Sequence, residues 1–417
     1  MADSFRPGDV KVHSLALWSN DRARSVTNMS GLVKNIKIYE SIMDPLMTAV
    51  ITIADGVGLR QSFPLIGEEY FELDLETPGM DEIFTYRFDV LSIGDIKEVH
   101  EDKSVVYNLY CSSTEIKKNT RIIHELMNDT APVDAVQKIF KDYLGSDKEL
   151  FTGEGVYAKV DFDLNRMRPL EAIDKIRLLT RNIQEQSSAF CFFETKHGFN
   201  FMSVEQMFGM GRTKIGDKVF FYDAAQGRSI YENNFRNIVG MSRLSDASPT
   251  RGTMGGQLNA KMKTFDIITG EVTERQYKDS ESGAGFIYAD DDASSLRSSS
   301  GQVEDGAEPA QYLMNVTDSS KSDPSIQEVV LERSSYVNKI IQQLYKIEIH
   351  GDLAISAGDV IEVNVPGASG LTDKSDDGTD QRFSGNFMVS RLVNNITFLG
   401  PRPVHSITCE LIKGNIR

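Results

Sequence analysis

The stretch GEEYFELDLETPG, from Gly67 to Gly79, decides the fold class of this chain. Its side chains fall into an apolar and an acidic set that alternate along the chain. The two sets are Phe71, Leu73 and Leu75 against Glu72, Asp74 and Glu76. Successive side chains of a strand point to opposite faces, so this period of two predicts an antiparallel strand with one solvated side.

The same period of two continues on both sides of this stretch. Runs with it lie at residues 36–38, 48–54, 84–90 and 105–111, and turn residues such as Thr77-Pro-Gly separate them. Several short strands at regular spacing favour a closed or sandwiched β architecture. We therefore expect residues 1–112 to form a first tube-like antiparallel β-barrel.

A weak echo of the opening stretch occurs near the other end of the chain. GDVIEVNVPG starts at Gly358, so that Phe71 to Leu75 parallels Ile361 to Val365, each run preceded by Gly and an acid and followed by Pro-Gly. Two interpretations remain open: a duplicated domain, or chance similarity between β-hairpins. With further alternating runs at 345–349, 387–389 and 407–411, we expect a second tube-like β-barrel in residues 325–417.

Between these regions the period changes from two to that of helices. Apolar residues keep helical spacing over 133–144 and 170–183, with an alternating run at 160–164 between them. The sequence FCFFETKHGFNFMSV then predicts a hairpin that turns at Gly198. Residues 113–206 therefore form a helix-containing α+β middle domain in this interpretation, and the overall class is mainly β with α+β insertions.

The rest of the chain divides into the start of the second barrel and an insertion. Residues 207–245 begin with the glycine-rich GMGRTKIG, interpreted as a flexible connection, and contain the strand-like KVFFYD. The insertion, 246–324, holds a hairpin around Gly270 and then an arm, Asp279 to Pro324, with ten acids and two basic residues. Such a composition predicts a long loop with little core of its own. A helix is expected to resume at about Ser325.

Composition excludes several classes of protein. The net charge of −16 over 417 residues is unsuited to a reader of duplex DNA that neutralises phosphates. The longest nearly apolar stretch, Leu46 to Ala54, is far short of the roughly 20 residues that span a bilayer. The N-terminus lacks the apolar core of a secretory signal, and Cys111, Cys191 and Cys409 indicate reduced thiols rather than a disulfide framework.

Catalytic and metal motifs are scarce, so we predict no catalytic, cofactor-binding or metal-ligating residues. No two histidines have the i, i+4 spacing of a helical metal site, and the GxSxG motif is absent. Two acidic runs approach a calcium loop, but Arg166 replaces the turn glycine in one and Ser384 the closing Glu in the other. Glu68, Glu69, Glu72 and Asp74 could supply a glycosidase pair, although the wet face of a strand explains them better.

The order of these segments resembles the hub proteins at the centre of contractile phage-tail baseplates. KIEIHGDLAISAGDVIEVNVP (from Lys346) and FSGNFMVSRLVNNI (from Phe383) resemble their closing barrel, which is also found in the base of type VI secretion spikes. The stretch from Met43 to Gly79 resembles their opening barrel, and the middle segment from Arg168 matches their helix-then-hairpin element.

The resemblance implies a homotrimer whose six barrels join the sixfold tail tube to a threefold spike. Its partners would be a spike protein below, the tube or a tube-initiator protein above, and surrounding baseplate proteins. DNA would pass through the lumen without sequence-specific binding. The location would be the virion's tail baseplate, assembled in the cytoplasm of the host bacterium, and the role would be structural rather than enzymatic.

If the two echoing strands are equivalent, their polar sets share one environment. These residues are Glu72, Asp74, Glu76, Glu362 and Asn364. They face either the lumen or the outer rim; the lack of neighbouring lysines in the sequence slightly favours the lumen.

Three alternative functions stay open: the hub of a phage-derived injection system, a carbohydrate-active β-domain enzyme, and a small-molecule or sugar-binding module. The single tryptophan, Trp18, argues mildly against a sugar site.

Overall fold

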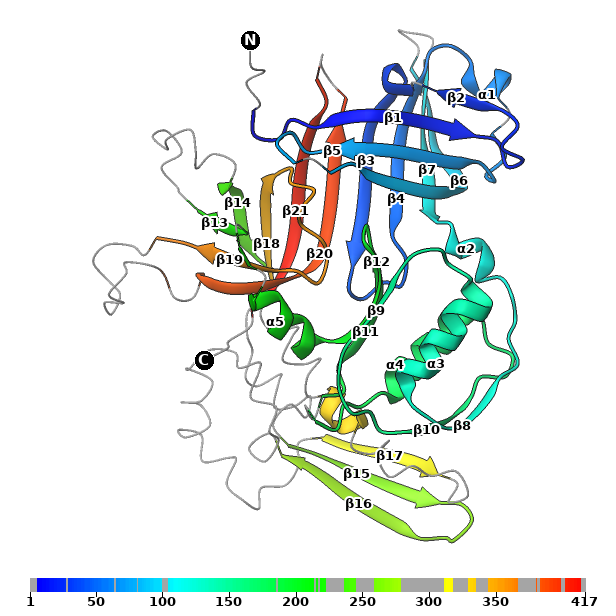
Figure 1. Cartoon of the computed structure of the whole chain (residues 1–417), viewed down its shortest axis with the longest axis vertical. Helices are drawn as coiled ribbons and strands as arrows, with labels where there is room; N and C mark the ends of the chain where they lie inside the picture. The colour runs from blue at the N-terminus through cyan, green and yellow to red at the C-terminus, as the bar shows by residue number, and fades with distance from the viewer. Residues whose placement is uncertain are drawn as a thin grey trace.

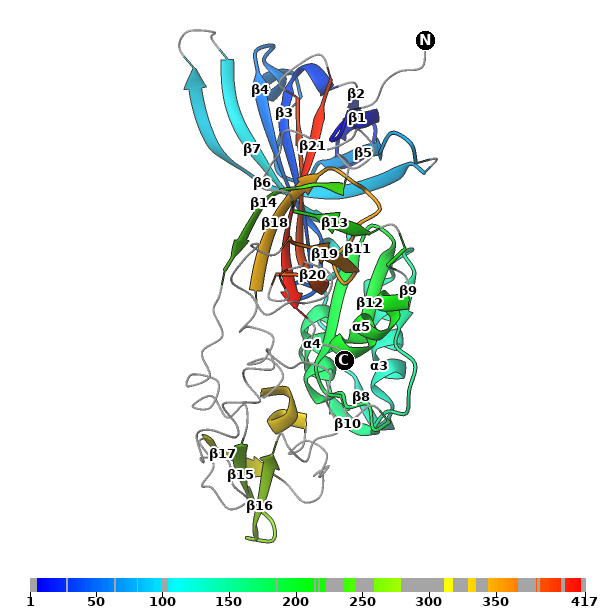
Figure 2. The ribbon, with the colours of Figure 1, turned by 90° about the vertical axis from the view of Figure 1, so that its left-hand side faces the viewer.

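The computed structural model describes most of the chain. The described residues are 6–27, 29–63, 65–80, 82–99, 104–184, 187–213, 215–216, 218–222, 236–244, 259–278, 311–317, 329–334, 344–366, 380, 383–398 and 402–413. The molecule is elongated, with large β-sheets at one end and a helical unit beside a small sheet at the other (Figures 1 and 2). It is mainly β, as predicted.

The first β unit is built from the N-terminal strands. These are β1 (Lys11–Trp18), β2 (Ser25–Thr27), β3 (Val33–Ser41), β4 (Thr48–Asp55), β5 (Tyr70–Glu76), β6 (Phe84–Val99) and β7 (Ser104–Ser113), with the short helices η1 (Met29–Gly31) and α1 (Leu59–Ser62). They pair in the order β3-β4-β7-β6-β5-β1-β2. The apolar set Phe71, Leu73 and Leu75 is fully buried in the core of this unit. Strand β1 was not predicted, although Leu15 and Leu17 alternate within it.

The second β unit joins two separate parts of the chain. Its strands are β13 (Val219–Phe221), β14 (Ile238–Arg243), β18 (Leu344–His350), β19 (Val360–Asn364), β20 (Gly385–Thr397) and β21 (Val404–Lys413). They pair in the order β14-β18-β21-β20-β19-β13. Ile361 and Val363 are fully buried in its core.

The two units share the pairing order of five strands, β3-β4-β7-β6-β5 and β14-β18-β21-β20-β19, and several irregularities. The next strand differs, because β1 pairs antiparallel with β5 whereas β13 pairs in parallel with β19. In both, the strand with the echo motif pairs with the start of a long strand, Phe71 opposite Phe88 and Ile361 opposite Phe387. The register shifts in equivalent places: between Val90 and Ser92 on β6 and between Val389 and Arg391 on β20. A second matching shift lies between Val33 and Asn35 on β3 and between Ile238 and Gly240 on β14. Bulges are specific features of a fold, so these matches support duplication over chance similarity.

A helical unit follows the first β unit. It contains α2 (Glu115–Lys118), β8 (Leu126–Thr130), α3 (Pro132–Ile139), the π-helical turn η2 (Phe140–Leu144), β9 (Leu150–Thr152), β10 (Val160–Asp163), α4 (Pro169–Leu179), β11 (Phe190–Thr195), β12 (Gly198–Ser203) and α5 (Val204–Thr213). The predicted hairpin β11–β12 is present and turns at Gly198, whose φ is +140°. GMGRTKIG is not simply a flexible connection, because its first five residues complete α5, which packs on β12 and β19.

The insertion contributes a separate three-stranded sheet. Strands β15 (Asn259–Asp266) and β16 (Val272–Lys278) form the predicted hairpin, and β17 (Gln311–Thr317) pairs in parallel with β15. The arm was predicted to be a long loop with little core of its own, and β17 departs from that prediction because it is a strand of this sheet. The sheet has a small core formed by Ala260, Met262, Tyr277 and Leu331, and Leu313 of β17 packs against it. Helical residues 329–334 contain that leucine, as expected after Ser325; the rest of that predicted helix and most of the arm lie outside the described residues.

Candidate functional site

The two β units join edge to edge within one chain. Strand β20 of the second unit pairs antiparallel with β3 of the first, with Arg391 opposite Ser41 and Thr397 opposite Asn35. The result is a continuous path of strands, β14-β18-β21-β20-β3-β4-β7-β6, which we call the wall (Figure 1). One face of the wall covers the two cores, and the other face carries polar side chains.

A polar row crosses the wall on the face away from the cores. It consists of Ser406, Asn395, Asn35, Thr52, Asn108 and Asp95, one each from β21, β20, β3, β4, β7 and β6. Asn35 Nδ2 donates to Asn395 Oδ1 at 2.7 Å and to Thr397 Oγ1 at 3.1 Å. Farther along, the Thr52 hydroxyl donates to Asn108 Oδ1 at 2.8 Å, and Asn108 Nδ2 donates to Asp95 at 2.9 Å. The polar row thus spans the junction between the units.

The surface around the polar row is hollowed. A cavity of about 690 Å³ is lined by residues of β20, β3, β4 and β7, including Lys34, Lys37 and Tyr39. Most of its lining is uncharged. The Tyr110 hydroxyl and the Asn108 amide donate to Asp95, which lowers the pKa of that carboxyl and fixes its charge. Amides and hydroxyls make up most of this concave face, and Lys34 and Lys37 are the cations among its lining residues.

The predicted lumen or rim residues lie elsewhere, on β5 and β19. Each of these strands joins the wall only through one long strand, β6 or β20, and pairs on its other side with β1 or β13. Glu72 lies 3.6 Å from Arg87, and Asp74 accepts a hydrogen bond from Thr85 at 2.6 Å. Asn364 donates to Glu362 at 3.1 Å. The structure therefore brings none of the five residues into the polar row.

Glu76 has the basic neighbours that the sequence did not show. Lys11 Nζ and His13 Nε2, both from β1, lie 2.6 Å from its two carboxylate oxygens. Hydrogen bonds from these two side chains lower the pKa of Glu76. The argument that this acidic face lacks nearby lysines is therefore wrong for Glu76, because β1 pairs with β5 although strands β2 to β4 lie between them in the sequence.

The tip of the β11–β12 hairpin lies where the middle unit meets both β units. Lys196 Nζ donates to the Ile355 carbonyl at 2.6 Å and lies 5.3 Å from the Phe84 ring centroid. Glu40, on the core side of β3, accepts from the Ala357 amide at 3.1 Å. Burial raises the pKa of Glu40 to about 6, although the nearby Lys196 charge opposes this, and burial lowers the pKa of Lys196.

A buried ion cluster fixes the middle unit to the first β unit. Lys148 contacts Glu115 at 3.0 Å and also pairs with Glu194, whose side chain is fully buried. The other oxygen of Glu194 accepts from the Met47 amide, at the start of β4, at 3.0 Å. Burial raises the pKa of Glu194, and Lys148 works against that rise. Because both acids share one lysine, that cation holds the contact together.

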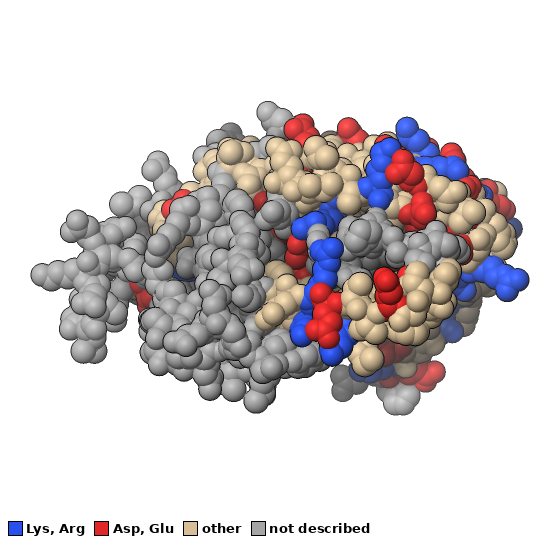
Figure 3. Space-filling view, turned by 90° about the horizontal axis from the view of Figure 1, so that it is seen from below, with Lys and Arg blue, Asp and Glu red and all other residues tan. Residues whose placement is uncertain are grey.

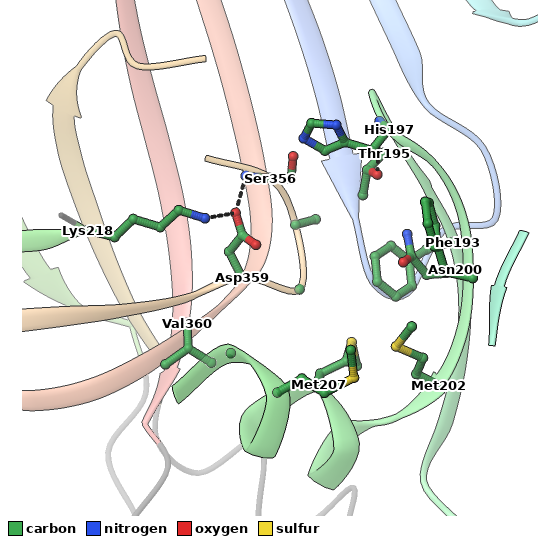
Figure 4. A pocket seen from close by; sticks show the side chains of 15 residues that line it. Phe193, Thr195, His197, Asn200, Met202, Met207, Lys218, Ser356, Asp359 and Val360 are labelled. Carbon is green, nitrogen blue, oxygen red and sulfur yellow. Dashed lines mark hydrogen bonds and ion pairs between the residues drawn. The ribbon is translucent and has the colours of Figure 1, made fainter. Parts of the chain in front are cut away.

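A second cavity lies beside this hairpin, between α5 and the loop before β19 (Figure 4). Its volume is about 260 Å³, and Phe193, Met202 and Met207 line its apolar side. On the other side Lys218 and Asp359 form an ion pair at 2.8 Å, and Asp359 also accepts from the Ser356 amide at 2.9 Å. The two charged side chains are thus engaged with each other rather than converging on the cavity.

The structure does not arrange the candidate glycosidase residues as a pair. Glu69 is buried and accepts the amides of Ile66, Gly67 and Glu68, which shapes the loop before β5. Neither of the two cavities above is lined by Glu69, Glu72 or Asp74. Asp161 accepts from the Asp129 amide and Asp163 from Asn165, and the other calcium-like run lies outside the described residues. Over the described part of the chain, no group of three metal-ligating side chains is found.

The outer surface carries charges of both signs. Seen from below, acidic and basic side chains intersperse over the described residues (Figure 3). Within those residues, no helix has both the length and the apolar character needed to cross a membrane.

No protein-family model and no curated protein matches this sequence. Solved structures do match over nearly the whole chain. A tail protein from Neisseria meningitidis has a TM-score of 0.57 at 9% identity and covers 96% of both chains. A 43 kDa prophage tail protein from Shewanella oneidensis has a TM-score of 0.55 at 8% identity, covering 96% of this chain and 98% of its own. A weaker likeness, at a TM-score of 0.47, is to a type VI secretion component from E. coli. This chain therefore has the fold of phage tail proteins.

Proposed function

We propose that this chain is a non-enzymatic structural subunit of a phage tail, the central hub of its baseplate. Three copies would place six β units in a ring that meets the sixfold tube on one side and a threefold spike on the other. The fold it shares with the Neisseria and Shewanella tail proteins supports a tail role.

The observation that carries the proposal is the duplicated wall. Two units with the same pairing order and matching bulges join through β20 and β3 into one sheet. A chain with two equivalent units already contains one copy of the contact between units from which a ring could be built. Repeating that contact between chains gives a closed ring when the rotation between neighbouring units divides a full turn, and a ring of three copies then holds six units.

The polar row supports the assignment of the lumen. DNA must slide through a tail without being held, and lysine or arginine contacts to phosphate bind DNA through release of counterions. The hollowed face of the wall is lined mainly by Asn, Thr and Tyr side chains, with Lys34 and Lys37 as the cations among its lining residues. We therefore assign this face to the lumen. Glu72, Asp74, Glu76, Glu362 and Asn364 then belong to the outer rim, where other baseplate proteins would dock.

Native mass spectrometry of the purified protein tests the proposal. A trimer should form without DNA or metal, because the ring closes through protein surfaces alone. The double variant Glu72→Lys with Asp74→Lys, on the face assigned to the rim, is the control and should remain a trimer. A chain that stays monomeric at every concentration, alone or with neighbouring tail proteins, would overturn the hub assignment.

A further inference from the structure

Two lysines in the cavity of about 690 Å³ on the wall have no acidic partner. They are Lys34 and Lys37 of β3, which we call the lysine pair, and no aspartate or glutamate is among the residues that line this cavity. Both side chains are exposed, and among the described residues neither ammonium group forms an ion pair or a hydrogen bond. The cavity is therefore a local positive site on a chain whose net charge is −16.

A bulge in β3 brings both lysines to the same face. The register of β3 against β4 shifts between Val33 and Asn35, so Lys34 is the extra residue. In a regular strand, Lys34 and Lys37 would point to opposite faces because they are three positions apart. A bulge re-aims a side chain, and here Lys34 lines the cavity together with Asn35 and Lys37.

Two cations elsewhere on the wall do have acidic neighbours. Lys346 of β18 lies 3.3 Å from Glu348, and Arg391 of β20 lies 3.8 Å from Glu410. A carboxylate therefore offsets the positive charge at each of these positions. The lysine pair differs from them, because its charge is available to an anion that enters the cavity.

The lysine pair occurs once in each chain, although the β unit is duplicated. Strand β14 has the bulge that matches the one in β3. Counting from the two bulges makes Val239 equivalent to Lys34 and Ser242 equivalent to Lys37, and neither of these β14 residues carries a charge. The site thus belongs to the first unit, beside the seam with β20, and a ring of three copies would contain three such sites.

Hydroxyl groups add neutral donors to the same cavity. The Thr397 oxygen accepts a hydrogen bond from Asn35 at 3.1 Å, so the proton of this hydroxyl stays available to a ligand. The Tyr39 hydroxyl also lines the cavity and donates to no group among the described residues. Ammonium groups and hydroxyls are donors that proteins commonly use to bind the phosphate oxygens of DNA.

We propose that the lysine pair is a phosphate-binding site, which contacts the backbone of DNA at one place in each copy. The inference rests on the proposed function, because it needs this face to be the lumen, and it adds which residues touch the DNA. Contacts of this kind carry no sequence information and allow DNA and protein to slide past each other. The rest of the lining is uncharged, so the attraction is confined to the lysine pair.

DNA binding by the full-length protein tests the site. The probe is a short fluorescein-labelled DNA duplex of mixed sequence, and its anisotropy is measured over a range of salt concentrations. The test variant is Lys34→Gln with Lys37→Gln. The control variant is Lys138→Gln with Lys141→Gln, which removes the same charge from two exposed lysines of the middle unit with the same sequence spacing.

The wild-type protein should bind the duplex at low salt and lose affinity as salt is added. Each phosphate contact contributes about 0.9 to the slope of log affinity against log salt, so the slope of the test variant should be shallower by about 1.8 for each copy that touches the duplex. The control variant should keep the wild-type slope. The site is overturned by a wild-type slope in the test variant, by equal losses in both variants, or by a wild-type protein that does not bind the duplex at low salt.

Two further measurements separate the phosphate site from its alternatives. A poly-glutamate peptide serves as competitor; if the lysine pair binds it more tightly than the duplex, the cavity accepts an acidic peptide and the DNA assignment is wrong. Native mass spectrometry reports the ring independently. A trimer that binds no duplex keeps the hub assignment and overturns the site, whereas a monomer that binds the duplex through the lysine pair keeps the site and overturns the ring.

Discussion

Asn35 and Asn395 are 360 residues apart in the sequence, yet a hydrogen bond of 2.7 Å joins their side chains across the seam between the two β units. The same Asn35 amide also reaches Thr397. One side chain of the first unit is therefore bonded to two residues of the second, on the face that we assign to the lumen.

Asn35→Ala should destabilise the seam. The substitution removes two hydrogen bonds in a partly buried setting, and a net hydrogen bond contributes about 1 kcal/mol, so a loss of about 1–2 kcal/mol is expected. Chemical unfolding followed by fluorescence measures it. Asn128→Ala, at an exposed position of β8, is the control and should change stability by less than about 0.5 kcal/mol. Equal effects of the two variants would contradict a stabilising role for Asn35.

Lysines placed on the hollowed face around the polar row should slow DNA release. Thr52→Lys with Thr397→Lys adds two cations to the hollowed face in each copy, and these would hold phosphates through counterion release. Assembled tails with this change should eject DNA more slowly, and added salt should restore the rate.

The matched control for that experiment adds the same two lysines on β5. Tails carrying Glu72→Lys with Asp74→Lys should release DNA at the normal rate if these residues face the rim. If only the variant with Glu72→Lys and Asp74→Lys released DNA slowly, these two residues would face the lumen and the polar row would face the rim.

Glu40→Gln should flatten part of the dependence of stability on pH. Burial raises the pKa of Glu40 to about 6, above its ordinary value of 4.5. Between these values the folded protein binds more protons than the unfolded chain, so the wild type loses stability relative to the variant as the pH rises through this window. The shift corresponds to about 2 kcal/mol at most. Thermal unfolding from pH 4 to 7 measures the difference.

Glu125→Gln is the control for the sign of this effect. Hydrogen bonds from Lys138 and Tyr143 lower the pKa of Glu125, so this carboxylate stabilises the fold above its ordinary pKa and loses that contribution as the pH falls. Its removal should shift the profile in the opposite direction. A Glu40→Gln profile parallel to that of the wild type would show that Glu40 keeps an ordinary pKa.

Lys148→Met should strongly weaken the contact between the middle unit and the first β unit. The change leaves Glu194 buried without its cation, and breaking one side of a buried ion pair costs about 3–5 kcal/mol. Limited proteolysis and thermal unfolding should both detect it. Lys159→Met removes an exposed pair with Asp129 and should cost less than about 1 kcal/mol. Similar melting temperatures for the two variants would refute the role given to Lys148.

The sequence by itself predicted many of the strands of the two β units and raised, without deciding it, the equivalence of the two units. The period of two in Phe71–Leu75 and Ile361–Val365 is a local property, and the pairings opposite Phe88 and Phe387 place these two runs at equivalent positions. The β11–β12 and β15–β16 hairpins were likewise predicted, because their turns and alternation lie within a few residues.

Only the tertiary structure showed which polar residues lie together on one face of the sheet. Amides and hydroxyls such as Asn35, Thr52 and Asn395 read in the sequence as the wet side of separate strands, and nothing local shows that register aligns them in one row. The sequence did not show the neighbours of Glu76 for the same reason, since Lys11 lies on β1, which pairs with β5 although strands β2 to β4 lie between them in the sequence. Side chains on a sheet meet the residues opposite them on other strands, so cross-strand register, rather than sequence spacing, sets the chemistry of each face.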